Sequence, residues 1–206
     1  DESDGHPYVM KVLLGEVAKA KALVKPERIV AEQDAILAAL FERSYVTLST
    51  AAQRVFLLLS SWRSVVPELA VEVVMLRSEN ERMHVTQALD ELKQFSLVEE
   101  VMGGDGNEVF ISVPLASMLF GRRKLKASPL RAAVDADRDM LMWFGPSTKT
   151  DARGGYGSAI KRLIERIAER VASGDETLAS HRETLEFVAR RVPAAWLLIA
   201  DLYVEQ

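Results

Sequence analysis

Few residues of this sequence could carry chemistry, and their spacing does not form a recognisable catalytic or metal centre. The three histidines, His6, His84 and His181, lie far apart, and no His-Glu-x-x-His pair is present. The chain has no cysteine, which excludes disulfide bonds and thiolate-bound zinc. The Gly-x-Ser-x-Gly turn of many hydrolases is also missing. We therefore expect no catalytic residue and no metal site, and we interpret His84 as a surface residue.

A glycine-rich stretch, "RGGYGS" at 153–158, precedes a helical pattern and could present backbone N–H groups to an anion. It does not follow a predicted strand, however, and it lacks the lysine of a Gly-x-x-x-x-Gly-Lys-Ser/Thr phosphate loop. We interpret it as part of a flexible linker over 145–157, because glycine, proline and small polar residues dominate that segment.

The basic cluster of the sequence could contact phosphate or nucleic acid. Its members are Arg122, Arg123, Lys124 and Lys126. Cations also gather at helix C-termini, where they offset the negative end of the helix dipole, and this is the simpler interpretation. The predicted helix over 78–95 carries two basic and four acidic residues, and the whole chain has a net charge of −4. Nucleic-acid binding depends on basic side chains, so we do not expect nucleic acid as a partner.

Composition indicates a folded, mainly helical chain. Apolar residues make up 49% of its 206 residues, enough to bury a core. No apolar run approaches the roughly 20 residues of a membrane span, so we expect a cytoplasmic protein without a membrane partner. The chain lacks an initiator methionine and stops within an apolar pattern, which indicates a piece of a longer protein.

Apolar residues recur at spacings of three and four along most of the chain, which predicts amphipathic helices. Thr50 and Gln53 predict a capping box at the start of one of them. The period changes in the runs Leu97–Met102 and Glu108–Val113, which the sequence "GGDGN" separates. Because glycine and asparagine tolerate positive φ, these runs predict a β-hairpin.

The order of these elements predicts three domains in a mainly α chain. Residues 1–48 form a small helical domain, and 49–120 form a winged helix, with three helices followed by one hairpin. Residues 121–206 form a helical segment that is either a small bundle or the start of an α-solenoid.

Three stretches, taken in order, resemble the regulatory half of STAND-class nucleotide switches, the NB-ARC and AP-ATPase relatives. They are "GHPYVMKVLLGEV", "ERSYVTLSTAAQRVFLLLSSW" and "VTQALDELKQFSLVEE". The resemblance covers residues 5–120, and it extends to 121–206 only by position. It implies that a parent protein binds ATP or ADP on an N-terminal nucleotide-binding lobe that this chain lacks.

The resemblance also implies one cofactor contact. In this family a Gly-x-Pro motif opens the small helical domain, and its proline packs against the adenine. The matching residues are Gly5, His6 and Pro7, although proline also suits an ordinary first helical position. Many relatives carry a Met-His-Asp triplet after the wing, whose histidine touches the β-phosphate of ADP. The matching place, Ser112 to Pro114, has no histidine, so no phosphate-sensing residue carries over.

Together these features predict a non-enzymatic regulatory module. It would relay the ATP or ADP state of the missing lobe to an effector protein bound by the C-terminal helices, with oligomerisation also compatible. One alternative is a winged-helix DNA-binding regulator with a helical dimerisation tail. The other is an interaction scaffold that never involves a nucleotide.

Overall fold

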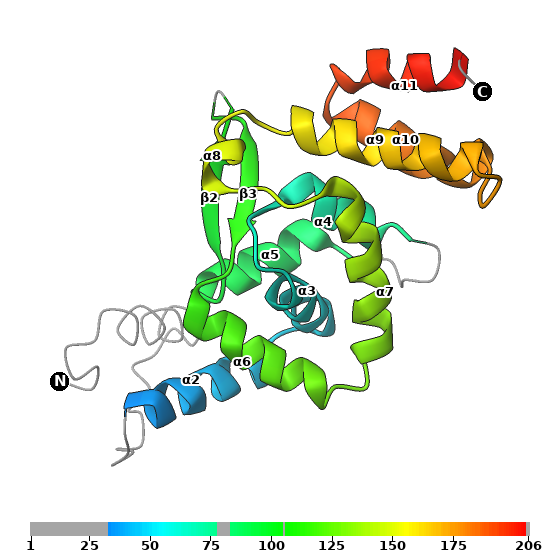
Figure 1. The fold of residues 1–206 in the computed structure, drawn as a ribbon. Helices are drawn as coiled ribbons and strands as arrows, with labels where there is room; N and C mark the ends of the chain where they lie inside the picture. Colours follow the sequence, from blue (N-terminus) through cyan, green and yellow to red (C-terminus); the bar gives the residue numbers. More distant parts are fainter. Residues whose placement is uncertain (1–32, 78–82, 105, 205–206) are drawn as a thin grey trace. The chain divides into compact units, whose positions relative to one another are not determined.

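The computed structural model describes residues 33–77, 83–104 and 106–204 (Figure 1). Within these ranges the chain is mainly helical, with ten α-helices and one three-stranded sheet. The expectation of a mainly α chain is confirmed, whereas the winged-helix assignment remains a prediction. The described residues divide into two compact units that interleave along the chain. The first holds 33–62, 84–99 and 113–134, and the second holds the rest.

The first unit is built around helix α3 (Thr50–Ser61). Its other helices are α2 (Gln33–Thr47), α5 (Val85–Gln94), α6 (Leu115–Lys126) and the start of α7 (Arg131–Leu141). Helix α3 packs against both α5 and α6. Seven consecutive or near-consecutive residues of α3 are buried: Ala52, Val55, Phe56, Leu57, Leu58, Leu59 and Ser60. The helix is therefore enclosed around most of its circumference.

The start of α3 differs from the prediction by one residue. Ser49, not Thr50, is the N-cap, and its side chain accepts a hydrogen bond from the Ala52 N–H at 3.2 Å. Gln53 does not close a capping box, because its amide donates to the carbonyl oxygens of Tyr45 and Leu48 instead. The Gln53 side chain thereby ties the end of α2 to the start of α3.

An aromatic cluster joins three helices of the first unit. Phe41 and Tyr45 of α2, Phe56 of α3 and Phe120 of α6 have ring centroids 5.4 to 6.3 Å apart. Tilted and edge-on ring pairs at these separations add to the stabilisation from apolar burial. Beside this cluster, Gly121 lets α6 approach α3, because a Cβ at that position would collide with Ser60.

The second unit contains the sheet, in the order β1-β3-β2. Strand β1 (Val66–Pro67) pairs antiparallel with β3 (Glu108–Ser112), with Val66 opposite Ile111. Strand β2 (Glu99–Gly103) lies on the other side of β3. Gly104 and Gly106 in the turn between β2 and β3 have φ values of 57° and 91°, which glycine adopts without strain. The predicted hairpin is confirmed, with shorter strands than expected.

Helices complete the second unit. Helix α4 (Glu68–Met75) packs on β1 and β3, and α10 (Arg182–Arg191) packs on α4. The 3₁₀ turn η1 (Met142–Phe144) follows α7 and packs against α9 (Gly157–Ala172). The remaining elements are α8 (Lys149–Ala152), η2 (Leu178–His181) and α11 (Ala195–Val204). Helix α11 rests on both α9 and α10, as the C-terminal helices of Figure 1 show.

Among the described residues, no helix combines the length and the apolar character that crossing a bilayer requires.

Candidate functional site

The predicted nucleotide contact cannot be placed. Gly5, His6 and Pro7 lie outside the described residues. The adenine contact therefore stays a prediction that rests on the sequence.

The predicted basic cluster lies in the last two turns of α6 and divides into two pairs. Arg122 and Lys124 make contacts within the first unit: the Arg122 Nε donates to the Ser60 carbonyl oxygen at 2.9 Å, and the Lys124 Nζ lies 2.7 Å from Glu42 Oε1. The Lys124 ammonium also lies 5.1 Å from the centre of the Tyr45 ring. These two cations therefore fasten α6 to α3 and α2.

The other pair, Arg123 and Lys126, is exposed. Neither makes an ion pair with any residue that the structure describes. The sequence did not distinguish these two residues from Arg122 and Lys124, because all four lie within five positions of one helix. Only two of the four candidate phosphate contacts are thus open to an outside partner.

Helix α5, which lies within the helix predicted over 78–95, presents little positive charge. Its exposed side chains are Thr86, Gln87, Asp90 and Gln94. Its lysine, Lys93, forms an ion pair with Asp90 at 2.6 Å, and Glu91 accepts hydrogen bonds from the N–H and hydroxyl of Ser49. His84 is exposed just before the helix, as expected. The described face of α5 therefore lacks the basic side chains that phosphate contacts need.

The segment predicted to be a flexible linker is a structured connection instead. Thr148 and Asp151 form a capping box that starts α8: the Thr148 N–H donates to Asp151 Oδ2 at 2.7 Å, and the Asp151 N–H donates to Thr148 Oγ1 at 3.1 Å. The hydrogen bonds from Thr148 lower the pKa of the Asp151 carboxyl group. The prediction was wrong because a short polar sequence is typical of a loop. Here the polar side chains of the segment instead cap a helical turn.

The glycine-rich start of α9 already holds a carboxylate from its own chain. The Tyr156 N–H donates to Glu108 Oε2 at 2.6 Å, and a Cβ on Gly155 would collide with that carboxylate. The Tyr156 hydroxyl donates to the Val109 carbonyl oxygen at 2.7 Å and accepts from the Val109 N–H at 2.9 Å. Burial is the main reason that the pKa of Tyr156 rises to about 12. An intramolecular anion thus occupies the position that the sequence offered to a ligand.

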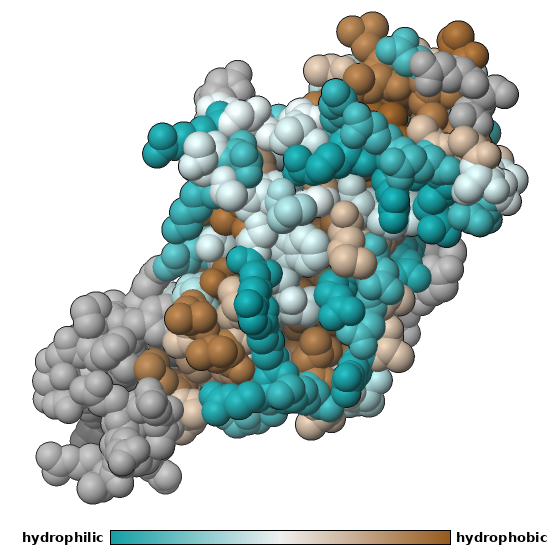
Figure 2. All heavy atoms as spheres, in the orientation of Figure 1, coloured by the Kyte–Doolittle hydropathy of each residue, from teal (hydrophilic) through white to brown (hydrophobic). Residues whose placement is uncertain are grey.

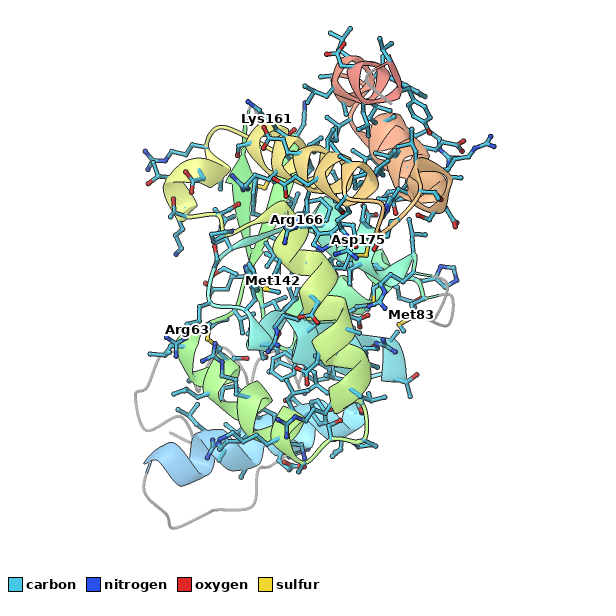
Figure 3. All side chains as sticks on the ribbon, turned by 45° about the vertical axis from the view of Figure 1, so that its right-hand side comes forward. Arg63, Met83, Met142, Lys161, Arg166 and Asp175 are labelled. Carbon is cyan, nitrogen blue, oxygen red and sulfur yellow. The ribbon has the colours of Figure 1, made fainter. Side chains whose placement is uncertain are left out.

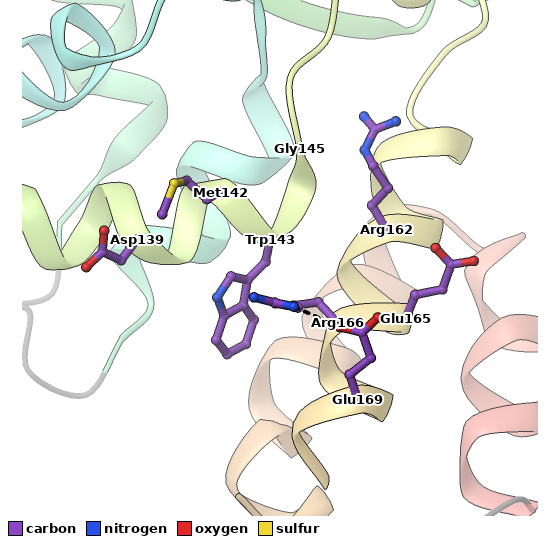
Figure 4. Close-up of a pocket in the computed structure, with 8 residues that line it drawn as sticks. All are labelled: Asp139, Met142, Trp143, Gly145, Arg162, Glu165, Arg166 and Glu169. Carbon is purple, nitrogen blue, oxygen red and sulfur yellow. Dashed lines mark hydrogen bonds and ion pairs between the residues drawn. The ribbon is translucent and has the colours of Figure 1, made fainter. Parts of the chain in front are cut away.

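A cavity of about 460 Å³ lies between η1 and α9 in the second unit (Figure 4). The Arg166 side chain reaches from α9 toward the Trp143 ring. Arg166 pairs with Glu169 at 2.8 Å, while the Arg162 Nε donates to the Phe144 carbonyl oxygen at 2.6 Å. The lining residues are Asp139, Met142, Trp143, Gly145, Arg162, Glu165, Arg166 and Glu169. The walls therefore carry both signs of charge, and both arginines already have partners.

A cluster of charged and aromatic side chains supports Trp143. The Arg170 guanidinium lies 5.4 Å from the Trp143 ring centre, and the His181 ring meets the Trp143 ring edge-on at 5.5 Å. Arg170 also pairs with Glu176 Oε1 at 2.6 Å. The buried His181 Nε2 lies 2.5 Å from Glu176 Oε2.

These neighbours shift the pKa of the Glu176 carboxyl group. The hydrogen bond from Arg170 is the largest influence and lowers the pKa of Glu176. Burial opposes this shift, and the charge of His181 adds to it. The sequence did not single out this cluster, because its four residues follow no regular spacing. They come together only because the chain reverses direction between α9 and η2. Lys161 near the start of α9, Arg166 in its middle and Asp175 after its end mark this path (Figure 3).

The surface of α11 differs from these charged regions. Five large apolar side chains on this helix are exposed: Trp196, Leu197, Leu198, Tyr203 and Val204. Hydrophobic side chains gather over this part of the surface (Figure 2). Scattered apolar residues are normal on a protein surface, but a contiguous group marks a surface that contacts a partner.

Within the part of the chain that the structure describes, no three His, Cys, Asp or Glu side chains gather as a metal site.

Comparison of the chain with protein-family models, with curated proteins and with solved structures found no match.

Proposed function

We propose that this chain is the regulatory part of a STAND-type nucleotide-dependent switch, and that its C-terminal helices bind a protein partner. The winged helix and the small helical domain would move together when the parent protein exchanges ADP for ATP. Only a difference in nucleotide affinity between two arrangements can drive such a change. The order of the motifs in 5–120 supports the first half of this proposal.

The observation that carries the second half is the distribution of exposed side chains. Five large apolar side chains of α11 face solvent. Of the four cations in the basic cluster of α6, two already have partners within the first unit. Apolar surface favours a protein partner. Exposed basic surface would have favoured nucleic acid.

The sequence upstream of Asp1 in the gene gives the most direct test of the nucleotide-switch proposal. A phosphate loop followed by an acidic residue at the end of a strand is expected there. A gene without any nucleotide-binding lobe ahead of Asp1 would overturn the proposal.

Nucleotide titration of the isolated chain gives a second test. We expect no ATP hydrolysis and no saturable binding of ATP or ADP at sub-micromolar concentration, because the phosphate-binding groups lie on the missing lobe. Turnover of ATP by this chain alone would contradict the assignment of a regulatory part.

DNA binding is the alternative that fluorescence anisotropy can separate from this proposal. A labelled duplex titrated at several salt concentrations should show neither sequence preference nor a steep salt slope. The matched variants are Arg123→Ala and Lys126→Ala, which remove exposed cations without touching the contacts of Arg122 and Lys124. Tight, salt-sensitive binding that these variants weaken would favour a DNA-binding regulator.

A further inference from the structure

Helix α11 is apolar on two opposite faces. One face, formed by Ala195, Ile199 and Leu202, is buried against α9 and α10. The residues of the other face remain open: Leu197 is 76% exposed and Val204 is 86% exposed. A helix that is apolar all round is normally buried all round. The open face of α11 is therefore a surface that lacks its cover within the described chain.

The open face has an ordered arrangement of side-chain types. Because each residue of an α-helix turns by about 100°, positions seven apart lie almost above one another. Trp196 and Tyr203 thus form an aromatic edge, and Leu197 and Val204 form an aliphatic edge. Ala200 is exposed midway between the two edges and midway along the stripe.

This arrangement is complementary to itself under a two-fold rotation. In an antiparallel pair with a two-fold axis between the helices, each edge faces the same edge of the second copy in reverse order. Trp196 then meets Tyr203 of the other copy, and Leu197 meets Val204, each contact occurring twice. The small side chain of Ala200 lies at the crossing, where it lets the helices approach closely.

We propose that this open face of α11 is a self-association surface, on which two copies of the chain pair as antiparallel helices. The inference rests on the second half of the proposed function, because it names a second copy of the chain as the protein partner of α11, and it does not depend on any nucleotide. A membrane surface is a poorer occupant, because membrane-surface helices carry basic side chains beside their apolar face. The charged residue within α11 is the acidic Asp201.

Asp201 gives the pairing a distinctive charge signature. It lies beside the aliphatic edge, about 40° further round the helix than Leu197, and it is exposed. The two-fold rotation brings the two Asp201 carboxylates to the same rim, where they repel each other. We expect added salt and Asp201→Asn each to tighten the dimer, by about two- to five-fold, because exposed charge interactions are weak and screened.

Sedimentation velocity of the full 206-residue chain tests the pairing. Over about 1 to 500 µM, we expect a monomer–dimer equilibrium with a dissociation constant on the order of tens of micromolar, since a single helix pair buries little area. Ala200→Glu places two like charges at the crossing and should weaken the dimer more than about 100-fold. Ala132→Glu, on an exposed face of α7, is the matched control and should leave it unchanged.

Disulfide trapping tests the antiparallel geometry. The chain contains no cysteine, so one introduced cysteine reports a single position. Helix axes 8–10 Å apart place the two Ala200 Cα atoms about 4–5 Å from each other, within disulfide range. Ala200→Cys should therefore cross-link under mild oxidation, and Ala132→Cys should not. Circular dichroism of every variant checks that the helices are intact.

Four results would overturn the inference. A chain that stays monomeric over the whole concentration range has no such surface. A dimer that Ala200→Glu leaves intact, or that Ala200→Cys does not cross-link, forms elsewhere. Growth into species larger than a dimer indicates an open contact rather than a closed two-fold pair. None of these results bears on the nucleotide-switch proposal, which the upstream gene sequence tests separately.

Discussion

Helices α3 and α11 are both rich in apolar residues, yet only α3 is enclosed. Helix α3 has α5 and α6 packed on it, and its Phe56 also meets the aromatic side chains of α2 and α6. Helix α11 rests on α9 and α10, and five of its seven large apolar side chains face solvent. An apolar sequence therefore indicates that a helix has surface to bury, while the number of neighbouring helices decides how much of that surface is buried.

The comparison teaches where stability and where recognition reside. In α3, truncation of an apolar side chain leaves a cavity that the surrounding helices cannot fill. In α11, the same truncation removes a side chain that water already surrounds. Paired substitutions on the two helices can therefore break or sharpen the comparison.

The largest effect should come from the pair Leu58→Ala and Leu197→Ala. Leu58 is fully buried in α3, so its truncation should lower the free energy of unfolding by about 2–5 kcal/mol. Leu197 is exposed, and its truncation should change that free energy by less than about 0.5 kcal/mol. Urea denaturation followed by circular dichroism measures both, at a concentration low enough for the monomer. Equal effects would mean that α11 is as enclosed as α3.

A smaller effect should come from the crossing of α3 and α6. An Ala at Gly121 would place its Cβ 2.5 Å from the Ser60 Cβ and 3.1 Å from the Phe56 ring, so the helices must move apart. We expect Gly121→Ala to lower the free energy of unfolding by about 1–3 kcal/mol. Gly157→Ala in α9 is the matched control, because its Cβ would meet no atom within 4 Å. Removing glycine there should be neutral or slightly stabilising. If both changes had the same effect, α3 and α6 would not be in close contact at Gly121.

The sequence predicted regular elements better than it predicted their surroundings. Periodicity identified the helix that became α3, and the change of period at Leu97 identified the hairpin, because both depend on residues that are close in the chain. The capping of α3 by Ser49 and the docked segment that starts α9 were missed. Both depend on which of several polar side chains accepts a hydrogen bond from a given backbone N–H. In the second case the acceptor, Glu108, lies 48 residues from Tyr156 in the sequence.

For the candidate sites too, the sequence predicted which residues lie together on one element but not their distant partners. The sequence located the basic cluster of α6 but could not tell that Arg122 and Lys124 have partners in α3 and α2, since those partners are more than 60 residues away. It treated the C-terminal helix as apolar but could not tell which of its faces stays open. The predicted adenine contact at Pro7 lies outside the described residues, so the structure does not bear on it.

Charge, rather than enclosure, holds the connection that leads from α9 to α10, and its pH dependence should differ from that of α3. The pKa of Glu176 is lowered in the folded chain, so its carboxylate adds stability above the pKa that it has when unfolded. That contribution is lost as the pH falls through the lower folded pKa. Glu176→Gln should therefore lower the free energy of unfolding by about 1 kcal/mol or less at pH 7, because the side chain is partly exposed. The difference from the unsubstituted chain should begin to shrink as the pH falls to about 4, near the pKa of an unfolded glutamate, and vanish only below the lowered folded pKa.

The control for this charge effect is Glu165→Gln on the exposed face of α9. Glu165 lies 3.7 Å from Lys161, and the two side chains are mostly exposed, so its removal should have little effect at any pH. Thermal unfolding at pH 7 and below pH 4 measures both variants. A Glu176→Gln difference that persists at low pH would mean that the side chain stabilises the chain by packing rather than by charge.

The smallest expected effects come from substituting Arg122, which has a partner at the end of α3, and Arg123, which is exposed beside it. The Arg122 Nε donates to the carbonyl oxygen of Ser60, one of the last acceptors of α3, which lacks a partner within its own helix. Arg122→Ala should lower the free energy of unfolding by about 0.5–1.5 kcal/mol, the usual net value of such a hydrogen bond. Arg123→Ala removes an exposed cation of the same type from the next position, and it should change that free energy by less than about 0.5 kcal/mol. Urea denaturation of the two variants side by side cancels their shared loss of one positive charge. Equal losses of unfolding free energy in Arg123→Ala and Arg122→Ala would mean that the cluster acts through its summed charge. The hydrogen bond from Arg122 to Ser60 would then add nothing to the stability of α3.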